Sequence, residues 1–226
     1  MIIHNLHRWN ITPKKAIQIQ RKLSTKIRYT PLRKRTKIIS GCDASFQGKK
    51  AIGSIVIMTY PELQVIEQVR KEIPVTYPYI PTLLTFREAP VLIKCFRMLK
   101  HDPDVIIFDG QGIAHPRRMG LATHMGILLS KPTIGCAKSR LTGTIKMPLS
   151  LRGNFTYIKD NKRNIIGALL RTRDEVKPVF ISVGNKITLE ECIKIILGCD
   201  GKYRLPEPIR AAHNLASPRR SQKTEF

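Results

Sequence analysis

The chain has 226 residues, of which 40 are Lys or Arg and 16 are Asp or Glu, so its formal net charge is +24. A hydrophobic content of 42% excludes a disordered basic tail, and this excess of positive charge indicates a polyanionic partner, with nucleic acid ahead of an acidic membrane. No apolar run approaches the roughly 18 residues of a membrane span, and the first residues lack the apolar stretch of a signal peptide, so we expect a cytoplasmic protein.

The five cysteines are scattered and form no C-x-x-C pair, which excludes the common zinc and disulfide patterns and predicts reduced core residues. No internal repeat and no linker divides the chain. We therefore expect a single domain over residues 1–226, with a polar, mobile tail at about 217–226.

The N-terminal region is basic and predicts a helix at about residues 12–36. Thr12 is a suitable N-cap, Pro13 suits the first helical position, and one face is apolar. No acidic residue precedes Asp43. This pattern favours a surface that follows nucleic-acid phosphates, although a solvated charged face remains the alternative.

The next elements read as an antiparallel meander followed by alternating helices and strands. Residues 74–81 hold three prolines and two tyrosines, which predicts a stiff projecting loop with aromatic tips. After this loop, Pro90 favours a helix that begins near Ala89, although Thr85 to Glu88 also match a capping box. The strands are expected at 37–45, 51–59, 63–71, 105–109, 132–137, 155–158, 165–170 and 178–183, and the later helices at 118–129, after a capping box of Thr188 and Glu191, and at 208–216.

The most informative stretch is residues 105–120, an apolar strand that ends in Asp109. Gly110 and Gly112 follow and permit close backbone approach, and His115 and Arg117 come within reach of an anion. Because open α/β sheets bind ligands at the carboxyl ends of their strands, this pattern predicts a site. A strand with an ordinary tight turn is the alternative, but it explains only the glycines.

This order of elements is that of the ribonuclease H-like fold, an α/β fold with a central mixed sheet flanked by helices, in which the first and fourth strands are neighbours. Asp43 and Asp109 would then lie side by side, and two adjacent carboxylates favour a bridging cation such as Mg²⁺. Glu88 is a candidate third oxygen donor, and His213 a later nitrogen ligand or its supporting partner. Lys138, at the end of the 132–137 strand, is a candidate phosphate clamp.

Six segments of the chain closely resemble the endonuclease V family, and together they lie between about residues 37 and 216. They are Pro78-Tyr79-Ile80-Pro81, Leu83-Leu84-Thr85-Phe86-Arg87-Glu88, Asp109-Gly110-Gln111-Gly112-Ile113-Ala114-His115-Pro116-Arg117, Lys131-Pro132-Thr133-Ile134-Gly135, Lys138-Ser139-Arg140-Leu141 and Tyr203-Arg204-Leu205-Pro206-Glu207-Pro208.

The resemblance implies an enzyme of DNA repair with a ribonuclease H-like fold that uses Mg²⁺, for which Mn²⁺ can substitute. Such enzymes cut a strand at the second phosphodiester 3′ to deoxyinosine and leave 3′-hydroxyl and 5′-phosphate ends, and several members act on inosine in RNA. By the resemblance, the metal site comprises Asp43, Glu88, Asp109 and His213, and the further catalytic residues are His115 and Lys138.

The resemblance also implies a substrate site. Tyr79 matches the tip of the wedge that fills the gap left by an extruded base, and extrusion of a weakly paired inosine costs only a few kcal/mol. The candidates for the base pocket are Leu84, Gly110, Gly120 and Leu141, with ordinary core and turn roles as the alternative. The family usually has glycine where this chain has Thr82, a departure that bears on base preference.

Two other functions stay open at this point. One is a non-catalytic, basic RNA-binding protein on the same scaffold, and the other is a different nuclease of this fold, such as a ribonuclease H or a junction resolvase. Retention of every presumptive ligand favours an enzyme, and the 78–81 wedge disfavours the second alternative. We expect a monomer whose partner is nucleic acid, inosine-containing DNA or RNA, with no membrane.

Overall fold

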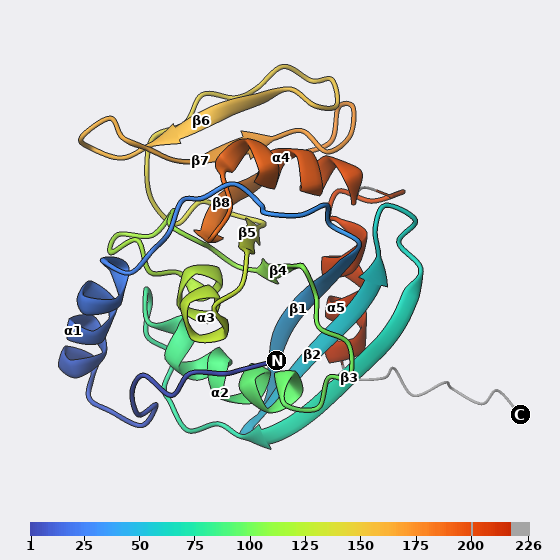
Figure 1. The fold of residues 1–226 in the computed structure, drawn as a ribbon. Helices are drawn as coiled ribbons and strands as arrows, with labels where there is room; N and C mark the ends of the chain where they lie inside the picture. The colour runs from blue at the N-terminus through green and yellow to red at the C-terminus, as the bar shows by residue number, and fades with distance from the viewer. Residues whose placement is uncertain (200, 218–226) are drawn as a thin grey trace, which may run out of the picture.

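The computed structural model describes residues 1–199 and 201–217, and Figure 1 shows one mixed sheet with helices on both faces. The strands are β1 (Ile38–Gln47), β2 (Lys50–Thr59), β3 (Val65–Pro74), β4 (Val105–Asp109), β5 (Thr133–Ala137), β6 (Phe155–Lys159), β7 (Ile165–Leu170) and β8 (Val179–Asn185). The helices are α1 (Pro13–Ser24), α2 (Leu84–Phe96), α3 (Leu121–Leu129), α4 (Leu189–Gly198) and α5 (Glu207–Ala216).

The strand order in the sheet is β3-β2-β1-β4-β5-β8-β7-β6. Strands β1, β2 and β3 form the predicted antiparallel meander, and β1 pairs in parallel with β4, in the register Cys42 to Phe108. Asp43 and Asp109 each come one residue later, so both carboxylates reach the same edge of the sheet. The predicted neighbourhood of the first and fourth strands is confirmed.

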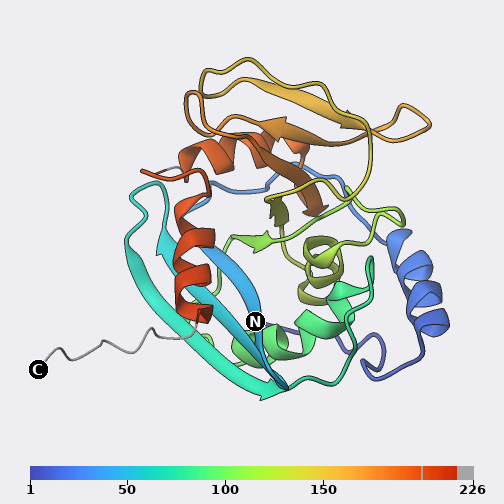
Figure 2. The same cartoon turned by 180° about the vertical axis from the view of Figure 1, so that it is seen from behind.

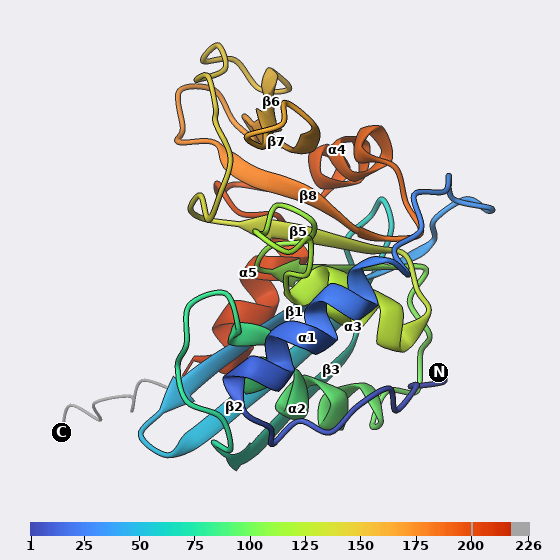
Figure 3. The same ribbon diagram turned by 90° about the vertical axis from the view of Figure 1, so that its left-hand side faces the viewer.

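The helices cover the sheet in two layers, each with its own hydrophobic core. Helices α2 and α3 pack on one face, in front of the sheet in Figure 1, against Phe108, Ile55 and Ile106. Helices α4 and α5 cover the other face, which is seen from behind in Figure 2. Helix α1 lies outside α3, as Figure 3 shows.

Close contact of α5 with β1 depends on Gly41. A Cβ atom at this position would lie 1.9 Å from the carbonyl oxygen of Pro208, so a larger residue would push the helix away. The hydroxyl of Ser54 donates to the carbonyl of Ala212 at 2.7 Å and also holds the helix to the sheet. These contacts bring the next residue of α5, His213, beside Asp43.

Two helix predictions need correction. The basic helix expected at about 12–36 ends at Ser24, where the hydroxyls of Ser24 and Thr25 donate to the carbonyls of Arg21 and Lys22. A helix through Pro31 is unfavourable, because proline has no amide N–H to donate and disfavours the helical conformation in the residue before it.

Helix α2 begins at Leu84 and contains Pro90, so the predicted start near Ala89 is wrong. The alternative, a capping box of Thr85 and Glu88, is wrong too, because Leu83 is the N-cap and its side chain makes no capping hydrogen bond. Phe86, Ala89, Leu92 and Ile93 are buried on this helix. Burial of such side chains yields about 1.5–3 kcal/mol each, which outweighs the roughly 3 kcal/mol cost of an internal proline.

The loop from Pro74 to Thr82 is only partly as predicted. Tyr79 is 67% exposed, but Tyr77 is 3% exposed and packs against Phe86 with ring centroids 5.6 Å apart. The loop therefore has one aromatic tip and one aromatic anchor. The tail expected to be mobile, 217–226, lies outside the described residues except for Ser217.

All five cysteines are buried, as predicted. In the described part of the chain, no helix has the length and apolar character that crossing a bilayer would require.

Candidate active site

Two carboxylates and one imidazole meet where β4 ends, beside the middle of β1. Each of Asp43, Asp109 and His213 offers a ligand atom, and these atoms all lie within 4.8 Å of one another. The Nδ1 atom of His213 is 2.8 Å from Oδ2 of Asp43, and Oδ1 of Asp43 accepts a hydrogen bond from the amide of Ala44 at 2.8 Å. Three elements, β1, β4 and α5, thus contribute one group each.

Glu88, on α2, lies outside this trio but interacts with it electrostatically. Burial, and then the negative charges of Asp43 and Asp109, raise the pKa of Glu88 to about 8. Burial and Asp109 also raise the pKa of Asp43, against the opposing effect of His213. Adjacent carboxylates are stable together only with protons or a cation, and oxygen donors with one imidazole suit a divalent metal ion. The residues present therefore fit a metal.

Lys138 follows β5 and reaches the same edge of the sheet. Its Nζ atom is 2.6 Å from Oδ2 of Asp109, on a side chain that is 42% exposed. The backbone that carries it is held by Arg204, whose guanidinium donates to the carbonyls of Lys138 and Pro178 at 2.8 Å each. A positive charge is thus positioned next to the carboxylates and open to solvent.

A cavity of about 100 Å³ opens beside the carboxylates, and all four predicted base-pocket residues line it. Its walls include Leu84, Gly110, Gly120 and Leu141, together with Thr82, His115, Glu88 and Asp109. Gly120 is required here, because a Cβ atom at this position would lie 2.2 Å from the carbonyl oxygen of Gln111. The structure therefore brings the pocket candidates and the acidic residues into one enclosure.

Thr82 is held in the cavity wall by several donors. Its φ of 67° lies in the left-handed region, which is unusual for a β-branched residue. Its carbonyl accepts hydrogen bonds from Gln20 Nε2 (3.0 Å), His115 Nε2 (2.9 Å) and the guanidinium of Arg117 (3.0 Å), and Arg117 also donates to its hydroxyl at 2.6 Å. This network fixes a strained backbone conformation next to the pocket.

His115, predicted to be catalytic, has both ring nitrogens engaged by the backbone. Nε2 donates to the carbonyl of Thr82, which requires Nδ1 to accept, and Nδ1 accepts from the amide of Arg117 at 3.1 Å. Burial is the main cause that lowers the pKa of His115 to about 4, so the ring is neutral at pH 7. The arrangement suits a residue that positions the cavity wall more than one that exchanges protons.

Gln20 was not among the residues singled out from the sequence. It is fully buried, it donates to the carbonyls of Thr82 and Met119, and it accepts a hydrogen bond from Nε of Arg117 at 2.6 Å. Its spacing, four residues after Ala16 and three before Leu23, puts a polar side chain on the buried face of α1. That signal was available in the sequence.

Tyr79 stands apart from the cluster, on the loop between β3 and α2. Its ring is exposed, and the neighbouring Tyr77 and Arg87 anchor the loop through a hydrogen bond from the Arg87 guanidinium to the Tyr77 carbonyl at 3.0 Å. The side chain is free to meet a partner.

Comparison with known proteins gives consistent results. The family model described as Endonuclease V matches residues 21–214. An endonuclease V of Methanothrix thermoacetophila is 44% identical over 214 residues, which cover 95% of each chain, and one of Dictyoglomus turgidum is 47% identical over 198 residues, 88% of this chain and 86% of that one.

Solved structures are similar to this chain over most of its length. The endonuclease V of Bacillus subtilis superposes with a TM-score of 0.90 at 31% identity and covers 95% of this chain and 94% of its own. The Ciona intestinalis endonuclease V, in complex with a 24mer DNA containing an inosine followed by a ribo-adenosine, gives a TM-score of 0.79 at 29% identity, over 90% of this chain and 95% of that one. The ribonuclease H-like fold class is confirmed, and the chain belongs to the endonuclease V family and is an endonuclease.

Proposed function

We propose that the protein recognises deoxyinosine in DNA and hydrolyses the second phosphodiester bond 3′ to it, leaving 3′-hydroxyl and 5′-phosphate ends, as a step of DNA repair. The observation that carries this proposal is the meeting of Asp43, Asp109 and His213 beside the small cavity. The inosine-containing DNA in the Ciona complex supports the choice of substrate.

Endonuclease V enzymes are metal-dependent in general, and the acidic cluster fits a metal. Asp43, Asp109 and His213 would hold the ion, with Glu88 as a further oxygen donor, and their chemistry favours Mg²⁺, for which Mn²⁺ can substitute. When bound, the ion supplies charge neutralisation at the scissile phosphate and a water of lowered pKa.

The other side chains contact the substrate or shape the site that holds it. The ammonium of Lys138 lies where it can pair with a phosphate oxygen and stabilise the negative charge that develops there. Leu84, Gly110, Gly120 and Leu141 enclose the extruded base, and Tyr79 fills the gap in the stack. His115 keeps Thr82 and the cavity wall in place, a positioning role.

Inosine in RNA is the second substrate that we propose, because the DNA of the Ciona complex carries a ribo-adenosine directly after the inosine. The non-catalytic alternative is set aside, since the chain belongs to a family of endonucleases. We further propose that the enzyme acts as a monomer in the cytoplasm.

The test is cleavage of end-labelled strands, DNA and RNA, single and double, each with or without one central inosine. We expect cutting one nucleotide beyond the inosine in Mg²⁺ and none in EDTA, and the better polymer identifies the main substrate. Cutting that ignores inosine would contradict the base specificity, and binding without cutting would contradict the proposed chemistry.

A further inference from the structure

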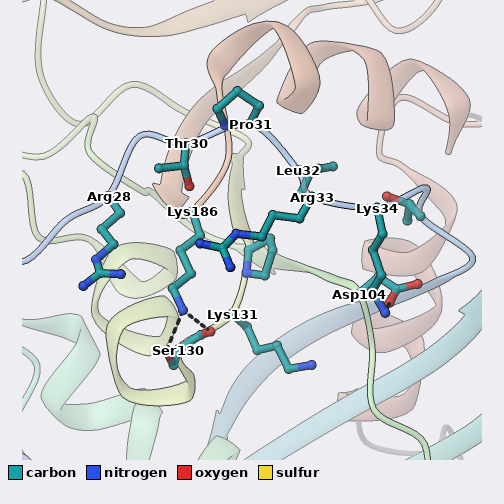
Figure 4. Close-up of a pocket in the computed structure, with 12 residues that line it drawn as sticks. Arg28, Thr30, Pro31, Leu32, Arg33, Lys34, Asp104, Ser130, Lys131 and Lys186 are labelled. Atoms are coloured by element: carbon teal, nitrogen blue, oxygen red, sulfur yellow. Dashed lines mark hydrogen bonds and ion pairs between the residues drawn. The ribbon is translucent and has the colours of Figure 1, made fainter.

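A second cavity, of about 350 Å³, lies at the edge of the sheet opposite the candidate active site (Figure 4). It is formed where β4 and β5 begin, at Asp104 and Pro132, whereas the carboxylates lie where β4 ends, beside the middle of β1. The five residues of β4 span about 16 Å at 3.3 Å per residue, which sets the separation of the two edges. The remaining walls come from residues 28–36, from the turn after α3 and from Lys186.

The cavity is strongly cationic. Five Lys or Arg side chains line it, but Asp104 is its only acid among the described residues. Lys34 pairs with Asp104 at 2.6 Å and Lys131 pairs with Asp102 at 2.7 Å. The other three, Arg28, Arg33 and Lys186, have no carboxylate partner in the part of the chain that the structure describes, so about three positive charges are uncompensated.

The fold holds these cations close together. The amide of Lys186 donates to the carbonyl of Arg28 at 2.6 Å, and the amide of Arg28 donates to Oδ1 of Asn185 at 3.0 Å. The Nζ atom of Lys186 donates to the carbonyl and hydroxyl oxygens of Ser130 at 2.8 and 2.7 Å, the dashed lines in Figure 4. Burial and the charges of Arg28, Arg33 and Lys131 lower the pKa of Lys186. A bound anion would relieve this repulsion.

A basic surface connects this cavity to the active site. Arg117 donates to Thr82 in the pocket wall, and burial, followed by the charge of nearby Arg21 on α1, lowers the pKa of Arg117. The segment after α1 then brings Arg28 and Arg33 to the cavity, and Tyr29, between them in the chain, lies next to Arg118. Figure 3 shows α1 on the outside of the molecule, leading to this segment. The part of this path formed by α1 and the segment after it lies in the stretch of sequence that has no acidic residue before Asp43.

We propose that the cavity binds backbone phosphates of the nucleic-acid strand that leaves the active site past the end of α1. This inference rests on the proposed action on nucleic acid, but it assigns a second site at the opposite edge of the sheet. Arg28 and Arg33 supply the forked donors that suit phosphate oxygens, and Lys186 supplies a fixed point charge.

The test compares two inosine-containing single strands, one with flanks of about 3 nucleotides and one with flanks of about 15, because about 16 Å corresponds to about 5 nucleotides at 3.4 Å each. The variant is Arg28→Gln/Arg33→Gln. The matched control is Lys71→Gln/Lys94→Gln, which removes the same charge from exposed positions on β3 and α2. Binding is measured by fluorescence anisotropy in EDTA across a series of salt concentrations, and inosine-free strands are included.

We expect the variant to weaken binding of the long strand severalfold more than binding of the short strand, and the control to affect both strands alike. The slope of log affinity against log salt for the long strand should shrink by about 1.4, at about 0.7 per lost phosphate contact. Because inosine-free strands in EDTA should show the same difference, the result does not depend on cutting at inosine. Folding is checked by cutting of the short strand in Mg²⁺.

Two outcomes overturn the proposal. One is equal behaviour of the variant and the control on the long strand. The other combines two results. Calorimetry shows that the wild type binds inorganic triphosphate and that the variant does not, while the variant binds the long strand as tightly as the wild type does. That outcome would assign the cavity to a free oligophosphate instead.

Discussion

Glu88 couples the acidic cluster to pH. Between its ordinary pKa of 4.5 and a folded-state pKa of about 8, the folded chain keeps a proton that the unfolded chain releases. Stability of the metal-free protein must therefore fall as pH rises through this window. We expect the free energy of unfolding in EDTA to drop by a few kcal/mol between pH 5 and about 8, measured by chemical denaturation.

Glu88→Gln should flatten this dependence, because a neutral amide replaces the carboxyl that resists ionisation. Glu190→Gln, on the exposed side of α4, is the matched control and should leave the curve as it is. A wild-type curve that is already flat in EDTA would contradict the raised pKa.

Asp109 is the carboxylate that contacts Lys138, at 2.6 Å, and that meets Asp43 at the sheet edge. Asp109→Asn keeps the shape of the side chain but removes its charge, so metal affinity should fall. Cutting should slow by more than about 100-fold, because the ion that neutralises charge at the scissile phosphate would be held less tightly, and loss of one such stabilising group commonly costs about 10²–10³-fold. Binding to inosine-containing DNA, measured by anisotropy, should persist. Undiminished cutting would refute the metal assignment.

Tyr79 offers an exposed ring at the end of a loop whose base is anchored. If the ring fills the gap left by an extruded base, Tyr79→Ala should slow cutting of an inosine in a duplex about tenfold or more, because stacking on an aromatic ring is worth about 1–3 kcal/mol per base. Single strands, which have no gap to fill, should be cut nearly as before. An equal loss on both substrates would remove the wedge role.

At the scale of the elements, α1, the loop before α2 and the loop after β4 meet at Thr82. Replacing Thr82 with glycine should relieve the left-handed backbone strain and enlarge the cavity of about 100 Å³. We expect Thr82→Gly to raise kcat/KM for xanthosine, whose base carries an additional carbonyl oxygen, relative to inosine.

Thr82→Ser separates the two contributions of the side chain, because it keeps the hydroxyl that accepts from Arg117 but removes the methyl group. It should shift the same kcat/KM ratio less than glycine does. Unchanged ratios in both variants would show that Thr82 does not decide base preference.

At the scale of the whole molecule, a net charge of +24 makes the affinity for nucleic acid depend on the salt concentration. Neutralising about six phosphates would reduce affinity about 10³-fold between 50 and 200 mM salt through counterion release. Anisotropy with an inosine-free duplex measures this slope without cutting. A flat response would leave the acid-free N-terminal region without a function in binding.

The elements that were predicted well are those with local signals. The N-cap at Thr12 and the capping box of Thr188 and Glu191 are present, because a cap needs only side chains within three or four residues. The predicted start of α2 is wrong because no local signal marks the true start, where Leu83 makes no side-chain cap. Burial of Phe86 and its neighbours stabilises the helix although it contains Pro90.

The residues of the candidate site also differ in how well the sequence predicts their partners. The approach of Asp43 and Asp109 followed from the order of strands, since parallel neighbours deliver their ends to one edge. Gln20, in contrast, acts on Thr82 across 62 positions of sequence. Its place on the buried face of α1 follows from its spacing, but only the packing of α1 determines its partner.

By itself, the sequence determined the family, the fold class, the basic character and the identity of the acidic cluster, because motifs, periodicity and charge are properties of the chain. Only the tertiary structure decided that burial keeps His115 neutral, that Tyr77 is an anchor and that five cations from three segments enclose a second cavity. Desolvation, hydrogen-bond partners and uncompensated charge depend on which distant residues pack together, and that packing is set by the whole fold.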